Sequence, residues 1–292
     1  MKVIVTGSAG FIGSRVVEAL HARGDTTIGV DPRSAGPVSF EDAVETGDVE
    51  RVVHLGAISS TLEGNDDLLR RVNVELPQRI WRWCAAEGVP LAYASSAAVY
   101  GLGMSGFEEE APCEPLNGYA RSKRDFDEWA LAQDAGPPSW AGCRYFNVYG
   151  EGEDHKGAMA SVVTKARWDI AAGRATKLFR WGHQCRDFVW VGDVVRATLW
   201  LLEADVTCLF NIGTGRAGTF EHLVSATWRC EGLEPSIDWI DMPAELRDRY
   251  QSYTRADIRR LRAAGYERPF LRPDEGIAES SGREASSASA AC

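Results

Sequence analysis

The stretch that decides the fold is Lys2-Val-Ile-Val-Thr6-Gly7-Ser-Ala-Gly10-Phe-Ile-Gly13, at the start of the chain. Its first five residues form an apolar run typical of a buried strand, and a helical pattern begins near Ser14. Glycines in this order allow a tight turn, a close approach of backbone to a pyrophosphate, and close packing of helix on strand. Because the helix N-terminus would also face the anion, the stretch predicts a dinucleotide site.

A carboxylate after the next apolar run bears on which dinucleotide would bind. Asp31 follows the run at 26–30 and lies eighteen residues after Gly13, where it can accept hydrogen bonds from ribose hydroxyls. A 2′-phosphate would meet this negative charge, which favours NAD over NADP. Arg33 could instead pair with that phosphate, or lie in solvent as a loop cation. The residues therefore favour NAD only narrowly.

The composition is that of a globular chain and excludes several classes of protein. The 292 residues are 45% hydrophobic and 25% charged, which rules out wholesale disorder. The formal net charge of −10, without a basic run, argues against nucleic-acid and membrane partners. No apolar stretch reaches the roughly eighteen residues of a membrane span. The first residues read as a strand rather than a secretion signal, so we expect a cytoplasmic protein.

Cysteine and histidine usage argues against a metal site. The seven cysteines and five histidines are dispersed. No Cys-x-x-Cys pair occurs, and the odd cysteine count is unlike a disulfide framework. We expect a reduced protein without a metal.

Apolar runs alternate with amphipathic stretches over the first 150 residues. The expected strands lie at 2–7, 26–30, 51–57, 90–96 and 142–150. This alternation predicts an α/β fold, a Rossmann-type doubly wound parallel sheet with helices on both faces.

Three regions are expected along the chain. Residues 1–150 form the dinucleotide-binding Rossmann domain, to which some later segments return, and residues 151–279 mainly form a smaller mixed α/β substrate-binding lobe. The later part holds an expected helix at 159–172, a strand near 177–180 and an apolar run at 209–215. The tail at 280–292 is small, polar and low in complexity, so we expect disorder there.

A candidate acid/base group lies in Tyr119-Ala-Arg-Ser-Lys123, which places a phenol and an ammonium on one helical face. Proton transfer at a carbinol needs a base near neutral pH, and an adjacent cation favours phenolate, so Lys123 is expected to lower the pKa of Tyr119. Ser96 ends an apolar run, at the edge where α/β sheets bind ligands, and its hydroxyl can hold the reacting oxygen.

Together, the glycine loop, VVHLGA (52–57), YASSAAVYG (93–101) and the Tyr119…Lys123 pair resemble the extended short-chain dehydrogenase/reductase family. Over 115–270 the chain resembles more specifically the members that epimerise an ADP-heptose at C6″. The segments that carry this similarity are PLNGYARSK, CRYFNVYGEGEDHKGAMASV, RDFVWVGDV, FNIGTGRAGTF and MPAELRDRYQSYTRADIRRLRAAGYERPF.

The resemblance implies an NAD(P)-dependent nucleotide-sugar epimerase. Such enzymes hold NAD or NADP tightly and recycle it: a hydride leaves C6″, a transient 6-ketone forms, and reduction from the other face inverts the centre. ADP-D-glycero-manno-heptose would become ADP-L-glycero-manno-heptose. By similarity, Tyr119 and Lys156 serve the two faces, and Ser96 and Lys123 support the phenol. Relatives also imply a homo-oligomer.

The glycine loop and the resemblance together give two sets of expected contacts. The cofactor set is Gly7, Gly10, Phe11, Ile12, Gly13, Asp31, Arg33, Leu55, Gly56, Ala57, Ser59, Asn73, Tyr119, Lys123, Val148 and Lys156. The substrate set is Ser96, Asn147, Ala158, Lys165, Phe179, Arg180, Arg186 and Tyr250.

Other interpretations stay open at this point. Lys156 could simply neutralise the three acids that precede it, and Arg186 could form a local ion pair with Asp187. The chain could be another nucleotide-sugar 4-epimerase, dehydratase or reductase. It could also be a non-catalytic dinucleotide-binding protein, although such a protein has no need of an acid/base pair.

Overall fold

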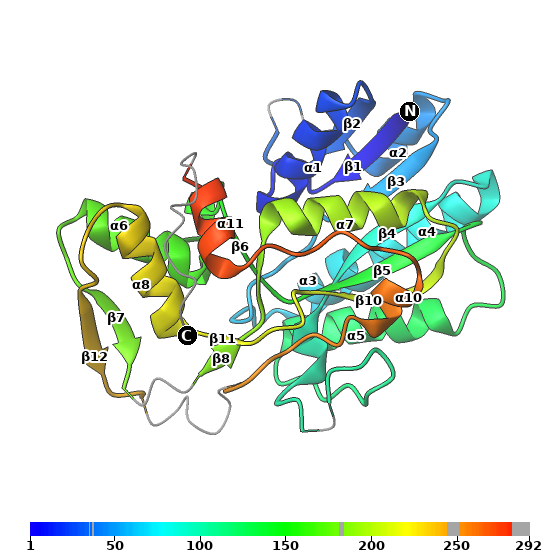
Figure 1. Cartoon of the computed structure of the whole chain (residues 1–292). Coiled ribbons are helices and arrows are strands. Elements are labelled where there is room, and N and C mark those ends of the chain that lie inside the picture. Colours follow the sequence, from blue (N-terminus) through cyan, green and yellow to red (C-terminus); the bar gives the residue numbers. More distant parts are fainter. Residues whose placement is uncertain (35, 37, 105, 181–183, 244–250, 282–292) are drawn as a thin grey trace.

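The computed structural model describes residues 1–281 except 35, 37, 105, 181–183 and 244–250. Its centre is a sheet of six parallel strands in the order β10-β5-β4-β3-β1-β2 (Figure 1). The strands are β1 (Lys2–Thr6), β2 (Thr26–Val30), β3 (Arg51–His54), β4 (Leu91–Ser96), β5 (Trp140–Tyr145) and β10 (Thr207–Ile212). The Rossmann-type fold expected from the sequence is confirmed.

Helices cover both faces of this sheet because both faces of its strands are apolar. Val3 and Val5 pack toward α1 and α7, while Ile4 packs on the opposite side with residues of α2, α4 and α5, as the two-residue period of a strand requires. The helices of this lobe are α1 (Phe11–Ala22), α2 (Phe40–Glu45), α3 (Asp66–Arg70), α4 (Leu76–Glu87), α5 (Gly118–Leu131), α7 (Val191–Glu203) and α10 (Arg259–Ala263), with a π-helical turn at Arg71–Glu75 and a 3-10 turn at Ala97–Tyr100.

The apolar stretch expected as one strand at 142–150 is two strands. β5 ends at Tyr145, and β6 (Asn147–Tyr149) leaves the sheet to pair with β9 (Phe188–Trp190). The expected run at 51–57 is likewise a strand only to His54. In both places the chain turns at the carboxyl edge of the sheet, where open α/β folds bind ligands.

A second lobe is built from short two-stranded sheets and helices. β7 (Thr176–Phe179) pairs with β12 (Ile237–Ile240), and β8 (Cys185–Arg186) pairs with β11 (Gly218–Thr219). The helical elements are a 3-10 turn at Asp154–Met159, α6 (Val162–Ala171), α8 (Phe220–Cys230) and α11 (Pro273–Glu279).

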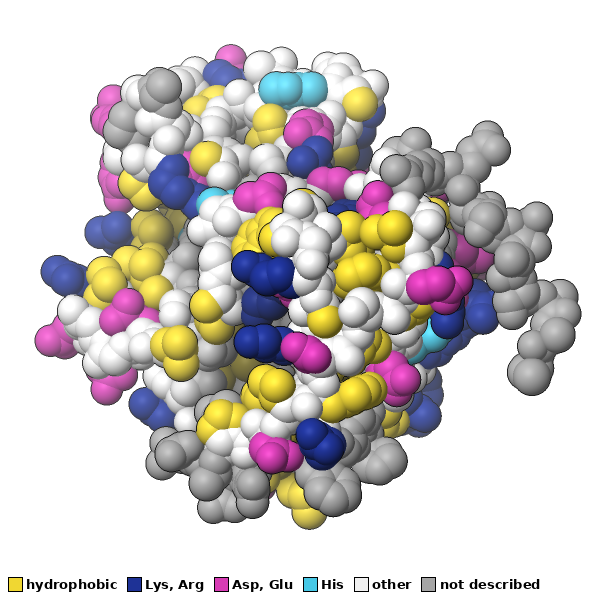
Figure 2. All heavy atoms as spheres, turned by 90° about the vertical axis from the view of Figure 1, so that its left-hand side faces the viewer, with side chains coloured by type: hydrophobic (Ala, Val, Ile, Leu, Met, Phe, Trp, Pro, Cys, Tyr) yellow, Lys and Arg dark blue, Asp and Glu magenta, His cyan; other side chains and the backbone are white. Residues whose placement is uncertain are grey.

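Lys and Arg side chains gather near the middle of the face seen from the second lobe, beside hydrophobic side chains (Figure 2). The charge of this side is therefore not uniformly acidic, despite the net charge of −10. Residues 282–292 of the expected tail lie outside the described residues. Within the part of the chain that is described, no helix is long and apolar enough to cross a membrane.

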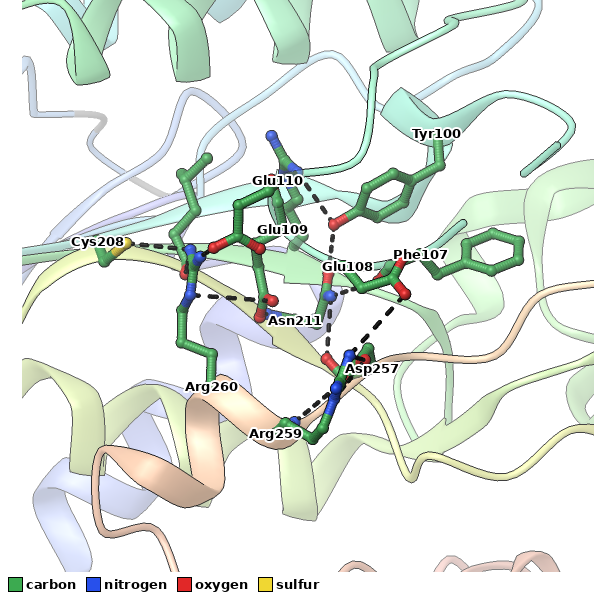
Figure 3. A network of polar contacts seen from close by, with 12 residues as sticks. Tyr100, Phe107, Glu108, Glu109, Glu110, Cys208, Asn211, Asp257, Arg259 and Arg260 are labelled. Atoms are coloured by element: carbon green, nitrogen blue, oxygen red, sulfur yellow. Dashed lines mark hydrogen bonds and ion pairs between the residues drawn. The ribbon is translucent and has the colours of Figure 1, made fainter. Parts of the chain in front are cut away.

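Asn211, on β10, joins the C-terminal segment to the sheet (Figure 3). Its side-chain amide donates to the carbonyls of Phe107, at 2.7 Å, and Asp257, at 3.1 Å, while its Oδ1 accepts from Tyr100. Its backbone N–H donates to the buried carboxylate of Glu109 at 2.8 Å. One side chain therefore ties β10, the loop after β4 and the segment before α10 into one unit.

The carboxyl ends of β1 and β3 are joined by a buried pair. The Thr6 hydroxyl lies 2.6 Å from His54 Nδ1 and also accepts from the backbone N–H of Gly56. Burial, with a smaller contribution from the Lys123 charge, lowers the pKa of His54 to about 3. The folded protein therefore keeps this imidazole neutral through the whole neutral and mildly acidic range.

The buried imidazole predicts an acid-dependent loss of stability. Below its ordinary pKa of about 6.5, His54 binds a proton only in the unfolded chain, so the free energy of unfolding falls by ~1.4 kcal/mol per pH unit until about pH 3. Denaturant unfolding at about pH 7 and pH 5 should show His54→Asn losing ~2 kcal/mol less than the wild type. The exposed His21→Asn is the matched control, and equal losses in all three proteins would contradict this account.

Candidate active site

A single cleft of about 1140 Å³ runs along the carboxyl edge of the sheet and into the second lobe. It is larger than the roughly 300–1,000 Å³ typical of a site for one small molecule. Both the glycine loop after β1 and residues from β7, α6 and α8 line it. The cleft therefore has room for a dinucleotide and a second ligand side by side.

The glycine loop brings α1 unusually close to the strand before it. Gly7 has a positive φ of +69°, and a Cβ added at Gly13 would lie 2.0 Å from the Gly7 carbonyl oxygen. No side chain caps the first turn of α1, whose N-cap is Gly10. An uncapped helix N-terminus over a glycine cradle fits the pyrophosphate of a nicotinamide dinucleotide.

Asp31 and Arg33 form a hydrogen-bonded ion pair in the part of the cleft expected to hold the adenosine. One carboxylate oxygen accepts from the Arg33 backbone and Nε at 2.9 and 3.0 Å, and the other accepts from Arg33 Nη2 and the Ala9 N–H at 2.9 and 3.1 Å. Burial opposes ionisation of Asp31, but the Arg33 hydrogen bonds outweigh it and lower the pKa of the carboxyl. Asp31 is thus a carboxylate whose partner is Arg33.

Tyr119, on α5, lies beside Ser96, the last residue of β4, and both line the cleft. Burial raises the pKa of the Tyr119 phenol, and its hydrogen bond with Ser96 acts in the opposite direction. Lys123 lies one turn further along α5 and donates to the Ala94 carbonyl at 2.8 Å. The expected lowering of the Tyr119 pKa by Lys123 is not found here, because burial dominates and lowers the pKa of Lys123 itself to about 8.

A buried ion pair fixes α5 to the sheet behind these residues. The Asp127 carboxylate accepts from Arg144 Nε at 2.9 Å, from Ser95 at 2.8 Å and from Tyr93 at 3.2 Å. Burial raises the pKa of Asp127, against the effect of Arg144. Three donors from β4 and β5 thus anchor the helix that carries Tyr119. The sequence patterns did not predict a role for Asp127, since a charged residue within a helix is usually interpreted as exposed to solvent.

Lys156 reaches the cleft from the opposite lobe. Its ammonium lies 4.8 Å from the centre of the Phe11 ring at the start of α1, and 3.3 Å from a carboxylate oxygen of Glu153. Of the three acids that precede Lys156, the buried Glu153 contacts it, whereas Asp154 accepts from Trp168 at 2.9 Å. The ammonium therefore contacts both an aromatic ring and a buried carboxylate.

Two further lysines line the far part of the cleft. Lys165, on α6, is half-buried, and burial lowers its pKa. Lys177 and Phe179 lie on one face of β7, as the alternation of a strand requires, and Phe220 begins α8. Lys177 and Phe220 were not predicted as site residues, although the alternation with Phe179 could have indicated Lys177.

Most of the expected contacts line the cleft, four do not, and a fifth is not among the described residues. The predicted residues that line it are Gly7, Gly10, Phe11, Ile12, Gly13, Asp31, Arg33, Leu55, Gly56, Ala57, Ser59, Ser96, Tyr119, Lys123, Asn147, Val148, Lys156, Lys165 and Phe179. Those not among the lining residues are Asn73, Ala158, Arg180 and Arg186. The fifth, Tyr250, lies outside the described residues.

Each of these four has another position. Asn73 is buried behind the residues that line the cleft, where its side-chain amide forms hydrogen bonds with the backbone of Ile58. Ala158 is exposed. Arg180 is exposed and donates to the Trp239 carbonyl at the end of β12. Arg186 lies with its guanidinium 5.7 Å from the Phe220 ring.

Asp187, which follows Arg186 in the chain, is held by backbone groups. Its carboxylate accepts from backbone N–H groups of Thr214, Gly215 and Ala256. Within the described residues, no group of three or more His, Cys, Asp or Glu side chains could hold a metal ion.

The NAD dependent epimerase/dehydratase family model matches residues 3–213. The chain belongs to this family. It is therefore an enzyme of the NAD-dependent nucleotide-sugar epimerase and dehydratase type. The dinucleotide cofactor predicted from the glycine loop agrees with this membership.

Solved structures resemble this family member over nearly its whole length. An ADP-L-glycero-D-manno-heptose-6-epimerase from Helicobacter pylori is 24% identical, with a TM-score of 0.83 and coverage of 96% of this chain and 95% of that one. A Thermus thermophilus UDP-glucose 4-epimerase in complex with NAD is 28% identical (0.79; 96% and 97%). An NAD-dependent NDP-hexosamine 5,6-dehydratase of tunicamycin biosynthesis is 24% identical (0.76; 96% and 96%).

The close approach of Gly13 to Gly7 predicts a specific loss of cofactor binding. In Gly13→Ala, the new methyl group must push α1 away from the loop, so we expect NAD affinity, measured by calorimetry, to fall at least about tenfold. Gly64→Ala is the control, because an added Cβ there meets nothing within 4 Å. Wild-type affinity in Gly13→Ala would show that the loop does not hold the diphosphate.

Proposed function

We propose that this enzyme inverts C6″ of an ADP-heptose, converting ADP-D-glycero-manno-heptose into ADP-L-glycero-manno-heptose. The observation that carries the proposal is that Tyr119 and Lys156, a phenol and an ammonium from different lobes, line the same cleft as the glycine loop. When the oxygen of a transient ketone moves from one face to the other, a proton acceptor on one side of the carbon and a proton donor on the other can serve the two half-reactions. The similarity of the segment around Lys156 to heptose 6-epimerases supports the same reaction.

The first half of the reaction is assigned to the α5 side of the cleft. A bound nicotinamide dinucleotide would accept a hydride from C6″ and later return it. Tyr119 takes the proton of the C6″ hydroxyl, and the Ser96 hydroxyl holds the same oxygen. Since burial raises the pKa of Tyr119, the positive charge of a bound oxidised nicotinamide would add to the Ser96 hydrogen bond in favouring phenolate.

The second half is assigned to Lys156. Once the ketone has turned over, its oxygen lies on the second face and takes a proton from the Lys156 ammonium as the carbon regains its hydride. The product is the inverted alcohol. Tyr119 has gained a proton and Lys156 has lost one, and proton exchange with solvent restores both groups before the next turnover. In a nucleotide-sugar 4-epimerase a single base can serve both faces, so a second acid/base group favours the 6-epimerase. A dehydratase would need a carboxylate beside Ser96, where this chain has Ala97 and Ala98.

The substrate diphosphate is assigned to the lysines of the second lobe. Lys165 and Lys177 line the part of the cleft beyond Lys156, and two cations there suit a doubly charged diphosphate. Phe179 and Phe220 supply apolar walls nearby. The second lobe would thus bind the nucleotide sugar while the Rossmann lobe binds the cofactor.

Product stereochemistry tests the proposal directly. Purified protein incubated with ADP-D-glycero-β-D-manno-heptose should shift the C6″ epimer ratio toward the L-glycero form, as followed by proton NMR. Tyr119→Phe should lose at least about 10²-fold in kcat because it cannot exchange the proton, while still binding NAD. Tyr253→Phe makes the same change at an exposed position outside the cleft lining and should keep wild-type activity.

The outcomes of this assay separate the alternatives. Conversion of a UDP-hexose at C4″, with no conversion of the heptose, would overturn the substrate assignment in favour of a 4-epimerase. Loss of water from the sugar would identify a dehydratase. Undiminished turnover by Tyr119→Phe would remove the role assigned to the phenol.

The Asp31–Arg33 pair supports NAD as the preferred cofactor, with NADP retained as a weaker ligand. Arg33→Ala leaves Asp31 without its guanidinium partner, so a 2′-phosphate would meet an uncompensated carboxylate. We expect the NAD-to-NADP affinity ratio from calorimetry to rise about tenfold. Arg174→Ala, which cuts an exposed pair with Asp169, is the control. An unchanged ratio would mean that Arg33 does not face the 2′ position.

A further inference from the structure

Glu153 is a wholly buried carboxylate next to the cleft, and its side chain is 0% exposed. Oε1 accepts from the Gly150 N–H at 3.2 Å and the Thr164 hydroxyl at 3.3 Å. Oε2 accepts from the Ser161 N–H at 2.8 Å and from Lys156 Nζ at 3.3 Å. Three donors therefore fix the carboxylate independently of Lys156, and the fourth is the ammonium itself.

The three fixed donors come from well-ordered elements around the loop at 150–161. Gly150 directly follows β6, Ser161 is the N-cap of α6, and Thr164 lies in its first turn. A carboxylate buried in this way is stable only when donors satisfy it. Its position is thus set by β6 and α6 rather than by the exposed turn that carries Lys156.

Without the Glu153 carboxylate, few neighbouring groups would hold the Lys156 side chain in one position. It is 25% exposed and extends from a 3-10 turn that ends beyond Gly157, whose φ is +51°. Its other titratable neighbours are Asp154 and His155 on its own turn and Lys165 on α6. Lys165 repels the Lys156 ammonium, whereas Glu153 attracts it at 3.3 Å.

We propose that Glu153 is the positioning residue of Lys156: it holds the ammonium against Phe11, on the second face of the reacting carbon. This inference rests on the proposed function, which gives Lys156 its role. Glu153 itself is not among the residues that line the cleft. A long lysine side chain that is free to move would lose much of its catalytic value, because a misplacement of about 1 Å can cost about 10² in rate.

Kinetics of Glu153→Gln give the first test. The amide keeps the volume but removes the charge that holds Lys156, so we expect kcat to fall at least about tenfold while KM changes less than about twofold. Asp154→Asn is the matched control: it removes a neighbouring charge that does not contact Lys156, and should leave both constants near wild type. A rise in KM with unchanged kcat would overturn the positioning role.

Chemical labelling gives a readout that needs no turnover. Under limiting acetylation, followed by mass spectrometry, Lys156 should react at least about threefold faster in Glu153→Gln than in the wild type or in Asp154→Asn, because its nitrogen is released from the ion pair. Equal labelling in all three proteins would overturn the proposal, whatever substrate the enzyme uses.

A second variant covers the case in which Glu153→Gln does not fold. Thr164→Val removes one donor to Oε1 and leaves the charge, the volume and the Ser161 bond in place. It should increase Lys156 labelling and lower kcat by about twofold to threefold. No change in either quantity would count against Glu153 as the support of Lys156.

The tests also separate this inference from the proposed function. Wild-type turnover by Lys156→Ala would remove the catalytic role of Lys156 itself. An inactive Lys156→Ala beside a fully active Glu153→Gln with unchanged labelling would leave the proposed function standing and overturn the positioning role alone.

Discussion

The contact between Gly13 and the Gly7 carbonyl is the constraint on which the rest of the site depends. It sets the distance between α1 and β1, and α1 in turn packs on α7 through Phe11, Val16 and Leu20. Phe11 is therefore placed by the glycine loop, and the ammonium of Lys156 lies over its ring. Through this one ring, the position of the cofactor loop bears on the geometry of an acid/base candidate in the other lobe.

Buried carboxylates organise the residues around the cleft from behind. Asp127 holds α5 to the sheet, Glu153 holds the turn with Lys156, and Asp187 accepts from the backbone of two separate segments, 214–215 and 256. Burial raises the pKa of both Asp127 and Asp187, while the surrounding donors act against it. Each of these acids lies outside the cleft lining, yet each fixes an element that contributes to it.

The sequence predicts the local parts of this structure well because they depend on near neighbours. Apolar runs indicate the strands, and the glycine order with Asp31 indicates the cofactor loop. Pairings over long distances could not be predicted this way: β6 leaves the sheet to pair with β9, which lies 41 residues later in the chain. In the sequence, Asn73 resembles a contact residue, but in the structure its side chain hydrogen-bonds with the backbone of Ile58. Glu153 resembles a surface acid in the sequence, but in the structure α6 buries it.

The hydrogen bonds that Asn211 makes with distant segments have a consequence for how the chain folds during synthesis. The sixth strand of the sheet, β10, follows β5 by more than sixty residues. Asp257, whose carbonyl accepts from the Asn211 side chain on β10, is synthesised later still. Until then β5 presents an unpaired edge, which is open to association with other chains. The Rossmann lobe of a growing chain thus cannot close its sheet until α6, β7 and β8 of the second lobe have left the ribosome.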